Sequence, residues 1–229
     1  MSDNVIAIIP ARIDSSRFPS KMIADASGKP LIQYAWEVAM AATSVSQVCV
    51  ATDSDEIAQT CAAFGGMVTM TCQHPNGTSR IAEAVREMDC DVVVSLQGDE
   101  PELDPAVIDA AVHMLGDNVM ATAACALEAD EISNEHVVKV IINGNGTAVD
   151  FARLTDDTSA MRHIGLYVYK SGFLQTYVSM QPTQNELTRR LEQMRAVDNG
   201  FDIAVACVDS QPSGIDTKEQ YDAFVARVS

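Results

Sequence analysis

A short apolar run close to the N-terminus limits this chain to a small group of folds. The run is Val5-Ile6-Ala7-Ile8-Ile9, in which apolar side chains follow one another without alternation. This pattern is typical of a strand that is buried on both faces of a parallel sheet. Because Pro10 cannot donate to a strand ladder, we expect the strand to stop there.

The segment after this strand is a loop that carries Arg12, Arg17 and Lys21. Ligands of open α/β sheets bind at the carboxyl ends of the strands, and Arg and Lys side chains bind anionic groups. The chain as a whole has 15 Lys and Arg against 32 Asp and Glu, a net charge of −17, so cations are scarce and this loop gathers them. The loop therefore predicts an anion site; the alternative is a solvated loop whose charges only maintain solubility.

Further apolar runs alternate with helical patterns along the chain. This alternation predicts βαβ units and a mainly parallel sheet flanked by helices, with a small antiparallel hairpin turning at Asn143-Gly144-Asn145-Gly146. The predicted strands are 45–52, 67–70, 91–96, 121–127, 137–142, 148–153, 163–169 and 203–208. The predicted helices are 31–42, 54–64, 81–88, 105–115, 185–197 and 218–228, with Ser54 or Asp53 capping the second and Thr78 or Ser79 capping the third.

Acidic side chains follow the strongly β-branched strand at 91–96. Gln97-Gly98-Asp99-Glu100 places an amide and two carboxylates at the end of that strand, and Gly98 permits close approach. Carboxylate ligands on a rigid strand end suit Mg²⁺, which takes one or two carboxylates and leaves its other positions to water and phosphate. Asp216 is a candidate second carboxylate. The alternative for these acidic residues is that they only begin or cap the following helices.

Composition excludes several classes of function. A pI near 4.4 argues against nucleic acid or an anionic membrane as the partner, because basic surfaces bind both. No apolar stretch approaches the roughly 20 residues that span a bilayer, and no leader pattern precedes the first strand, so we expect a cytoplasmic protein. The six cysteines are scattered and predict small core residues in a reducing compartment. The Walker A and dinucleotide-binding glycine patterns do not occur.

Nine short motifs occur together, in one order, over nearly the whole chain. They resemble those of the 3-deoxy-manno-octulosonate (Kdo) cytidylyltransferases, the CMP-Kdo synthetases. The motifs are IIPAR at 8–12, SRFPSK at 16–21, GKPLI at 28–32, ATD at 51–53, NGTSRI at 76–81, QGDEP at 97–101, RHIGLYVY at 162–169, LEQMR at 191–195 and GIDT at 214–217.

The resemblance implies a nucleotide-diphospho-sugar-transferase-like fold and transfer of CMP from CTP to Kdo, with pyrophosphate released, for lipopolysaccharide or capsule synthesis. It implies a homodimer and a single domain over 1–229, with a smaller sugar-binding and dimerisation part at about 137–185. Arg12, Arg17 and Lys21 would hold the triphosphate, with Asp99 and Asp216 holding Mg²⁺. Substrate-binding residues would be Ala11, Ser16, Arg80, Gln97, Gly98, His163, Tyr167, Glu192 and Gln193.

This sequence departs from the family pattern at three places. Ser79 stands where the family usually has an acidic residue, the segment between Arg153 and Arg162 is shorter, and Thr188 to Arg190 lack a common acidic residue. Two alternatives to a Kdo enzyme therefore stay open: a cytidylyltransferase for another acidic sugar or a polyol phosphate, and a non-catalytic nucleotide-binding relative. The strand face that carries His163 and Tyr167 has two interpretations as well, a sugar-site wall or a half-exposed sheet face.

Overall fold

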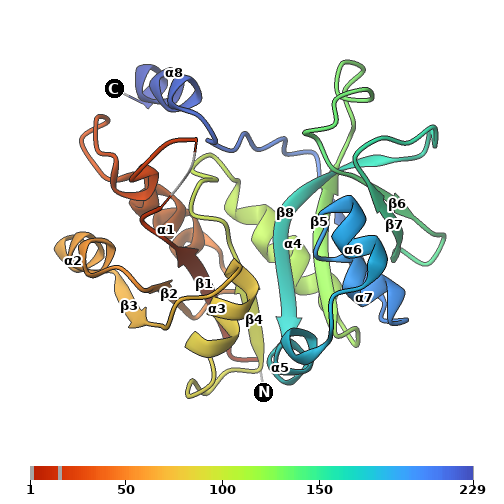
Figure 1. Ribbon diagram of the computed structural model, residues 1–229, viewed down its shortest axis with the longest axis horizontal. Helices are drawn as coiled ribbons and strands as arrows, with labels where there is room; N and C mark the ends of the chain where they lie inside the picture. Colours follow the sequence, from red (N-terminus) through yellow and green to blue (C-terminus); the bar gives the residue numbers. More distant parts are fainter. Residues whose placement is uncertain (1–2, 15–16, 229) are drawn as a thin grey trace.

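A computed structural model describes residues 3–14 and 17–228 of the chain, which form an α/β structure (Figure 1). Its strands are β1 (Val5–Ala11), β2 (Gln47–Thr52), β3 (Met67–Met70), β4 (Val92–Ser95), β5 (Met120–Cys125), β6 (Lys139–Ile142), β7 (Ala148–Ala152), β8 (Met161–Lys170) and β9 (Ile203–Cys207). Its helices are the 3₁₀ turn η1 (Lys21–Ile23), α1 (Leu31–Ala41), α2 (Asp55–Ala63), α3 (Gly77–Ala84), α4 (Pro105–Leu115), α5 (Ser171–Ser179), α6 (Gln184–Arg189), α7 (Met194–Asp198) and α8 (Lys218–Val228).

The strands of the described residues join in one sheet with the order β3-β2-β1-β4-β8-β5-β9. Strands β1 to β4 pair in parallel, as do β5 and β9, whereas β8 runs antiparallel to both β4 and β5. The hairpin of β6 and β7 pairs with the beginning of β8. The predicted parallel sheet with an antiparallel part is therefore confirmed.

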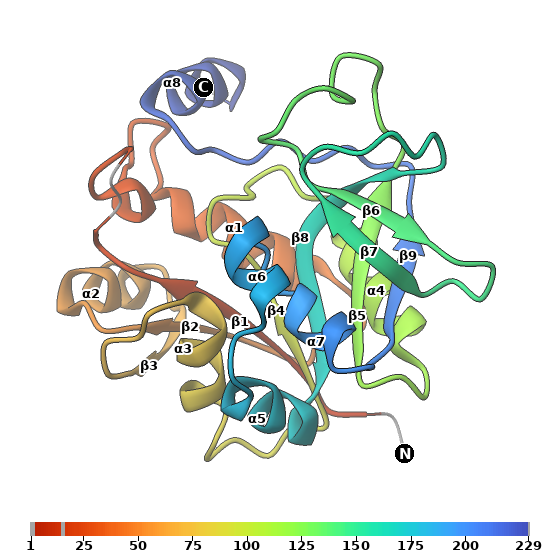
Figure 2. The same cartoon turned by 45° about the vertical axis from the view of Figure 1, so that its right-hand side comes forward.

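Helices cover both faces of the sheet. Helices α1, α2 and α4 share one buried apolar cluster with alternate residues of β1, and α3, α5 and α7 share a second cluster with the intervening residues (Figure 2). Strand β1 is buried on both faces for this reason, as its uniform apolar sequence predicts. Helix α8 lies apart from the sheet and packs Tyr221 and Phe224 against Leu31. No helix in 3–14 and 17–228 combines the length and apolar character needed to cross a membrane.

The prediction that Pro10 ends the first strand is wrong. Strand β1 continues through Pro10 to Ala11, and Pro10 pairs with Ala51 of β2. Strand β4 flanks β1 only as far as Ile8, so at Pro10 the strand has one neighbour instead of two. A proline is tolerated at such a half-paired position because its missing N–H faces no second strand.

Helix α3 begins earlier than predicted. Its cap is Asn76, whose side-chain oxygen accepts a hydrogen bond from the Ser79 backbone at 2.8 Å, rather than Thr78 or Ser79. Asn, Thr and Ser are all favoured N-cap residues, so the sequence Asn76-Gly-Thr-Ser does not by itself show which of them caps the helix. The Ser54 cap of α2 is confirmed.

The single helix predicted over 185–197 is also wrong. The segment forms two short helices, α6 and α7, with Arg190 between them in the left-handed region at φ 55°. Thr183 and Glu186 close a capping box at the start of α6, and Leu187, expected on the buried stripe, is 61% exposed. Helix α5 is absent from the predicted helices; it packs Phe173, Leu174 and Tyr177 into the second cluster.

The cysteines are buried only in part. Cys49, Cys61 and Cys125 lie in the core, as expected, but Cys72 and Cys207 are exposed. All six are free thiols. The core interpretation is therefore correct for half of them and wrong for the two exposed residues.

Candidate functional site

A pocket of about 390 Å³ opens at the carboxyl ends of β1 and β4. These strands end next to each other because they pair in parallel, with Val5 opposite Val92. The residues that line the pocket come from loops after the strands, from the beginning of α3 and from the segment before α8. They are Pro10, Ala11, Arg12, Asp14, Arg17, Lys21, Met22, His74, Pro75, Asn76, Gly77, Arg80, Gln97, Asp99 and Asp216.

Lys21 lies at the centre of the polar contacts in this pocket. Its ammonium donates to Asp99 Oδ2 and to the backbone oxygen of Ile215, each at 2.6 Å, and lies 3.8 Å from Asp216 Oδ1. The Lys21 side chain is 5% exposed, so its charge is compensated by these acceptors rather than by water. Asp99 and Asp216, the predicted carboxylate pair, thus both lie near Lys21 Nζ although they are far apart in the sequence.

The two arginines of the predicted anion loop are exposed to solvent. Arg17 donates to Asp216 Oδ1 at 2.7 Å, whereas Arg12 has no ion-pair partner within the described ranges. An exposed pair such as Arg17 with Asp216 adds little to stability, because water and salt screen it. Both guanidinium groups therefore remain available to an incoming anion.

Arg80 is a second buried cation of the pocket, after Lys21. It is 4% exposed, lies 3.1 Å from Asp53 Oδ1, and donates to the Thr71 hydroxyl at 2.7 Å. These partners come from the ends of β2 and β3, so they fix the guanidinium beside the first turn of α3. Backbone N–H groups in that turn, together with Arg80, favour a negatively charged ligand.

Gly98 lies close to the side chains of Met22 and Ile9. A Cβ atom there would be 2.9 Å from Met22 Sδ and 3.2 Å from Ile9 Cγ2. We expect Gly98→Ala to lower the free energy of unfolding by about 1 to 3 kcal/mol, because Met22 must move from its place in the pocket wall. Urea unfolding would measure this loss.

Gly144→Ala is the matched control for Gly98→Ala. Nothing lies within 4 Å of a Cβ atom at Gly144, so this change should alter the free energy of unfolding by less than about 0.5 kcal/mol. Equal stability of the two variants would contradict the packing argument.

Glu100, next to Asp99 in the chain, is half-buried. Burial and the nearby charge of Asp99 raise the pKa of Glu100 to about 7. Its Oε2 atom has no hydrogen-bond partner among the described residues, and its Oε1 atom would lie 3.2 Å from a Cβ at Gly214. This carboxyl therefore packs tightly against the segment that delivers Asp216.

His163, Tyr167 and Tyr169 form a row of rings along β8. The ring centroids are 5.3 Å apart for His163 and Tyr167 and 6.2 Å apart for Tyr167 and Tyr169, and Phe151 meets His163 edge-on at 5.2 Å. The predicted shared face is confirmed. Tyr169 is buried in the cluster that includes α5 and α7, whereas His163 and Tyr167 are only half-buried, as the half-exposed interpretation of this face expects.

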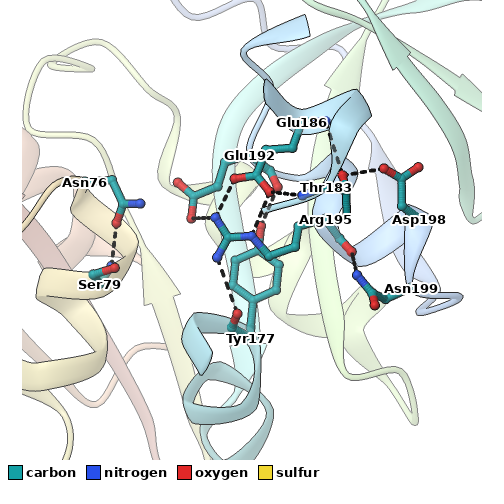
Figure 3. A network of polar contacts seen from close by, with 9 residues as sticks. All are labelled: Asn76, Ser79, Tyr177, Thr183, Glu186, Glu192, Arg195, Asp198 and Asn199. Atoms are coloured by element: carbon teal, nitrogen blue, oxygen red, sulfur yellow. Dashed lines mark hydrogen bonds and ion pairs between the residues drawn. The ribbon is translucent and has the colours of Figure 1, made fainter. Parts of the chain in front are cut away.

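Glu192 belongs to a buried polar network between α5, α6 and α7 (Figure 3). Arg195 donates to both carboxylate oxygens of Glu186, stacks over the ring of Tyr177 at 5.0 Å, and lies 3.9 Å from Glu192 Oε1. Tyr177 also donates its hydroxyl to the backbone oxygen of Glu192 at 2.6 Å. Burial raises the pKa of Glu192, whose Oε1 atom has no hydrogen-bond partner in the described part of the chain. Gln193 is buried beside it.

The structure brings most of the predicted nucleotide residues together and leaves the predicted sugar residues outside their pocket. Those that line the pocket are Ala11, Arg12, Arg17, Lys21, Arg80, Gln97, Asp99 and Asp216. Those that do not are Gly98, His163, Tyr167, Glu192 and Gln193, while Ser16 lies outside the described residues. Gly165 lies between His163 and Tyr167 on β8. A Cβ atom at Gly165 would lie 3.9 Å from the side chain of Gln97, which lines the pocket, so β8 and the pocket are neighbours.

Sequence reasoning missed Asp14, Met22 and His74 as pocket residues. His74 pairs with Glu83 of α3 and lines the pocket. The available signal was position: His74 precedes the Asn-Gly turn that begins α3. A second groove, of about 1000 Å³, shares Arg17 and Asp216 with the pocket and extends to Arg153 and Arg190.

The carboxylates of the pocket fit a magnesium ion. Asp99 and Asp216 both reach Lys21 Nζ, so they can serve one cation, and two carboxylates are the usual protein share for Mg²⁺ beside phosphate. Within 3–14 and 17–228, no group of three or more His, Cys, Asp or Glu side chains forms a metal site by itself. Phosphate and water oxygens would therefore supply the other ligands.

Comparison with known proteins gives a consistent result. Residues 6–203 match the family model described as "Cytidylyltransferase". The 3-deoxy-manno-octulosonate cytidylyltransferase of Geobacter sulfurreducens is 38% identical, covering 98% of this chain and 99% of the relative. That of Chlorobium limicola is 40% identical, covering 96% and 95%. A solved structure of CMP:2-keto-3-deoxy-manno-octonic acid synthetase complexed with CTP matches with a TM-score of 0.93 at 32% identity, over 98% of each chain.

Proposed function

The chain belongs to the 3-deoxy-manno-octulosonate cytidylyltransferases, a family of nucleotidyltransferases, and we propose that it transfers CMP from CTP to Kdo or a closely related acidic keto sugar, with magnesium. The observation that carries the proposal is the placement of Lys21. One buried ammonium contacts Asp99 and approaches Asp216, and Arg12 and Arg17 lie at the same pocket. A triphosphate with its metal needs this combination of cations and carboxylates.

The proposed reaction is an in-line displacement at the α-phosphorus of CTP. The anomeric hydroxyl oxygen of the sugar forms a bond to that phosphorus, the bond from phosphorus to the bridging oxygen breaks, and pyrophosphate leaves with its electron pair. Arg12, Arg17 and Lys21 neutralise the charge that gathers on the phosphate oxygens, and Arg80 fixes the nucleotide beside α3. Holding both reactants in line supplies much of the rate.

Asp99 and Asp216 would hold the magnesium ion. When bound, the ion favours loss of the proton from the attacking hydroxyl and withdraws charge from the phosphates. The pairing of Asp216 with Arg17, and of Asp99 with Lys21, keeps both carboxylates compensated before the ligands bind. Arg17 can then move to phosphate because its pair is exposed.

The acceptor half of the proposal rests on residues of β8 and on Glu192, which lies between α6 and α7. His163 and Tyr167 supply two neighbouring rings, and Glu192 a carboxyl group, in a region that neighbours the pocket through Gly165 and Gln97. Such polar groups on an aromatic wall suit a polyhydroxylated ring. We further propose a homodimer, with 137–185 as the sugar-binding and dimerisation part, and a product used in lipopolysaccharide or capsule assembly.

The experiment is pyrophosphate release from CTP, measured with and without Mg²⁺. Acceptors would be Kdo, its 8-amino analogue and a sialic-type sugar, with a polyol phosphate as the unrelated acceptor. We expect release with Kdo or the 8-amino analogue, and loss of release with EDTA that excess Mg²⁺ restores. Release only with the polyol phosphate would overturn the acceptor, and CTP binding without release from any acceptor would favour a non-catalytic relative.

A further inference from the structure

Strand β8 carries an irregularity directly opposite Thr122 of β5. Thr122 pairs with Tyr167, but its neighbour Ala123 pairs with Ile164, so Gly165 and Leu166 are extra residues on β8. A bulge of this kind takes backbone groups out of the ladder and re-aims the side chains beside it. The bulge lies between His163 and Tyr167, in the middle of the aromatic row.

The Thr122 hydroxyl occupies this bulge. Its oxygen lies 2.6 Å from the backbone oxygen of Leu166, 3.4 Å from that of Ile164, and 2.9 Å from His163 Nε2. Thr122 is fully buried, so water does not supply other partners. Among the described residues, all polar contacts of this hydroxyl are therefore with these three atoms.

Proton counting determines the direction of each hydrogen bond. A carbonyl oxygen only accepts, and a hydroxyl has one hydrogen to donate. At 2.6 Å the contact between the Thr122 and Leu166 oxygens needs that hydrogen between them, because two oxygen lone pairs at this distance repel. The Thr122 oxygen then has only acceptor capacity towards His163, so the hydrogen between them belongs to His163 Nε2.

The other ring nitrogen of His163 is left as an acceptor. Nδ1 has no protein hydrogen-bond partner in 3–14 and 17–228, and the ring stands between Phe151 and Tyr167. Burial among these groups lowers the pKa of His163 to about 3, which keeps the ring neutral at physiological pH. A neutral imidazole protonated on Nε2 carries its lone pair on Nδ1.

We propose that Thr122 is a positioning residue that fixes His163 as the Nε2–H tautomer, so that Nδ1 receives a hydrogen bond from a hydroxyl or amino group of the acceptor sugar. The tautomer stands on the geometry alone, whereas the sugar contact rests on the proposed function. His163 then selects acceptors that bring a donor to Nδ1 and acts neither as an acid nor as a cation. A site built to pair with a donor rejects analogues that lack it.

Imidazole nitrogen NMR tests the tautomer without any substrate. Long-range proton–nitrogen correlation spectra of the full chain, with the His163→Gln variant used to assign the signal among the four histidines, report which nitrogen carries the proton. We expect a protonated Nε2 and an unprotonated Nδ1 at neutral pH. A protonated Nδ1, or a doubly protonated ring, would overturn the proposal even if the enzyme proves to use another acceptor.

Two variants of Thr122 test its role. Thr122→Ser keeps the hydroxyl and should keep the tautomer. Thr122→Val keeps the shape and removes the hydroxyl; it should mix the two tautomers and raise KM for the sugar about three- to tenfold, the worth of one hydrogen bond, while KM for CTP stays unchanged. Equal KM values for the sugar in Val and Ser variants, or equal losses for CTP and sugar, would contradict it. If the Val variant does not fold, the wild-type spectrum still decides.

Discussion

Asp99→Asn should lower kcat for pyrophosphate release by about 10³-fold or more. The amide keeps the size of the side chain and removes the charge that contacts Lys21 at 2.6 Å and that would hold the metal. Metal ions contribute several kcal/mol to such a transition state, and each 1.36 kcal/mol corresponds to a factor of ten. Initial rates at saturating CTP and sugar, measured across a range of Mg²⁺ concentrations, would give the value.

Two controls separate this chemical effect from damage to the pocket. Asp202→Asn replaces an exposed aspartate beside β9, away from the pocket, and should leave kcat unchanged. Asp99→Asn should still bind CTP in the absence of metal, since Arg12 and Arg17 are untouched. A kcat within tenfold of the wild-type value would contradict the role of Asp99. A variant that no longer binds CTP without metal would show that Asp99 supports the pocket instead.

The second large effect concerns stability. Arg195→Met should lower the free energy of unfolding by about 3 to 5 kcal/mol, because it leaves the buried carboxylate of Glu186 without its cation (Figure 3). Both oxygens of Glu186 accept from Arg195, and the guanidinium also covers the Tyr177 ring. Urea unfolding followed by circular dichroism would give the midpoint and slope for each variant.

A double variant and a surface control sharpen this test. Adding Glu186→Gln to Arg195→Met removes both charges and should recover part of the loss, since no uncompensated charge stays buried. Arg86→Met, at an exposed arginine, should change the free energy of unfolding by less than about 0.5 kcal/mol. A double variant less stable than Arg195→Met alone would contradict the argument from the uncompensated charge, because Gln at 186 can still close the capping box with Thr183.

The sequence was most informative where one local cause determines the structure. Uniform apolar runs such as Val92-Val93-Val94 can be satisfied only by a doubly covered strand, and α4 runs from Pro105 to Leu115 as its pattern predicts. The carboxyl ends of parallel strands lie together, so the placement of Asp99 near the loop of Lys21 followed from topology. The meeting of Lys21 and Asp99 was therefore predictable.

The failures arise where distant parts of the chain decide the local structure. Arg190 ends α6 in a left-handed conformation, and Glu186 pairs with Arg195 across this break. The helical periodicity of 185–197 contains no sign of either feature. Thr122 looks like an ordinary strand residue until the bulge on β8 brings the Leu166 oxygen to it. Tertiary contacts of this kind override local propensity, and one sequence does not display them.

The contacts of Lys21 also determine when, during synthesis of the chain, the pocket can be completed. This residue, near the beginning of the chain, is satisfied by Asp99 from the middle and by the backbone of Ile215 close to the end. A growing chain on the ribosome reaches Ile215 only after every strand of the sheet has been synthesised. The contacts of Lys21 therefore cannot be complete in an unfinished chain. A chain cut before Ile215 would keep every described strand, yet it would lack the Ile215 backbone oxygen and the Asp216 carboxylate that lie near Lys21.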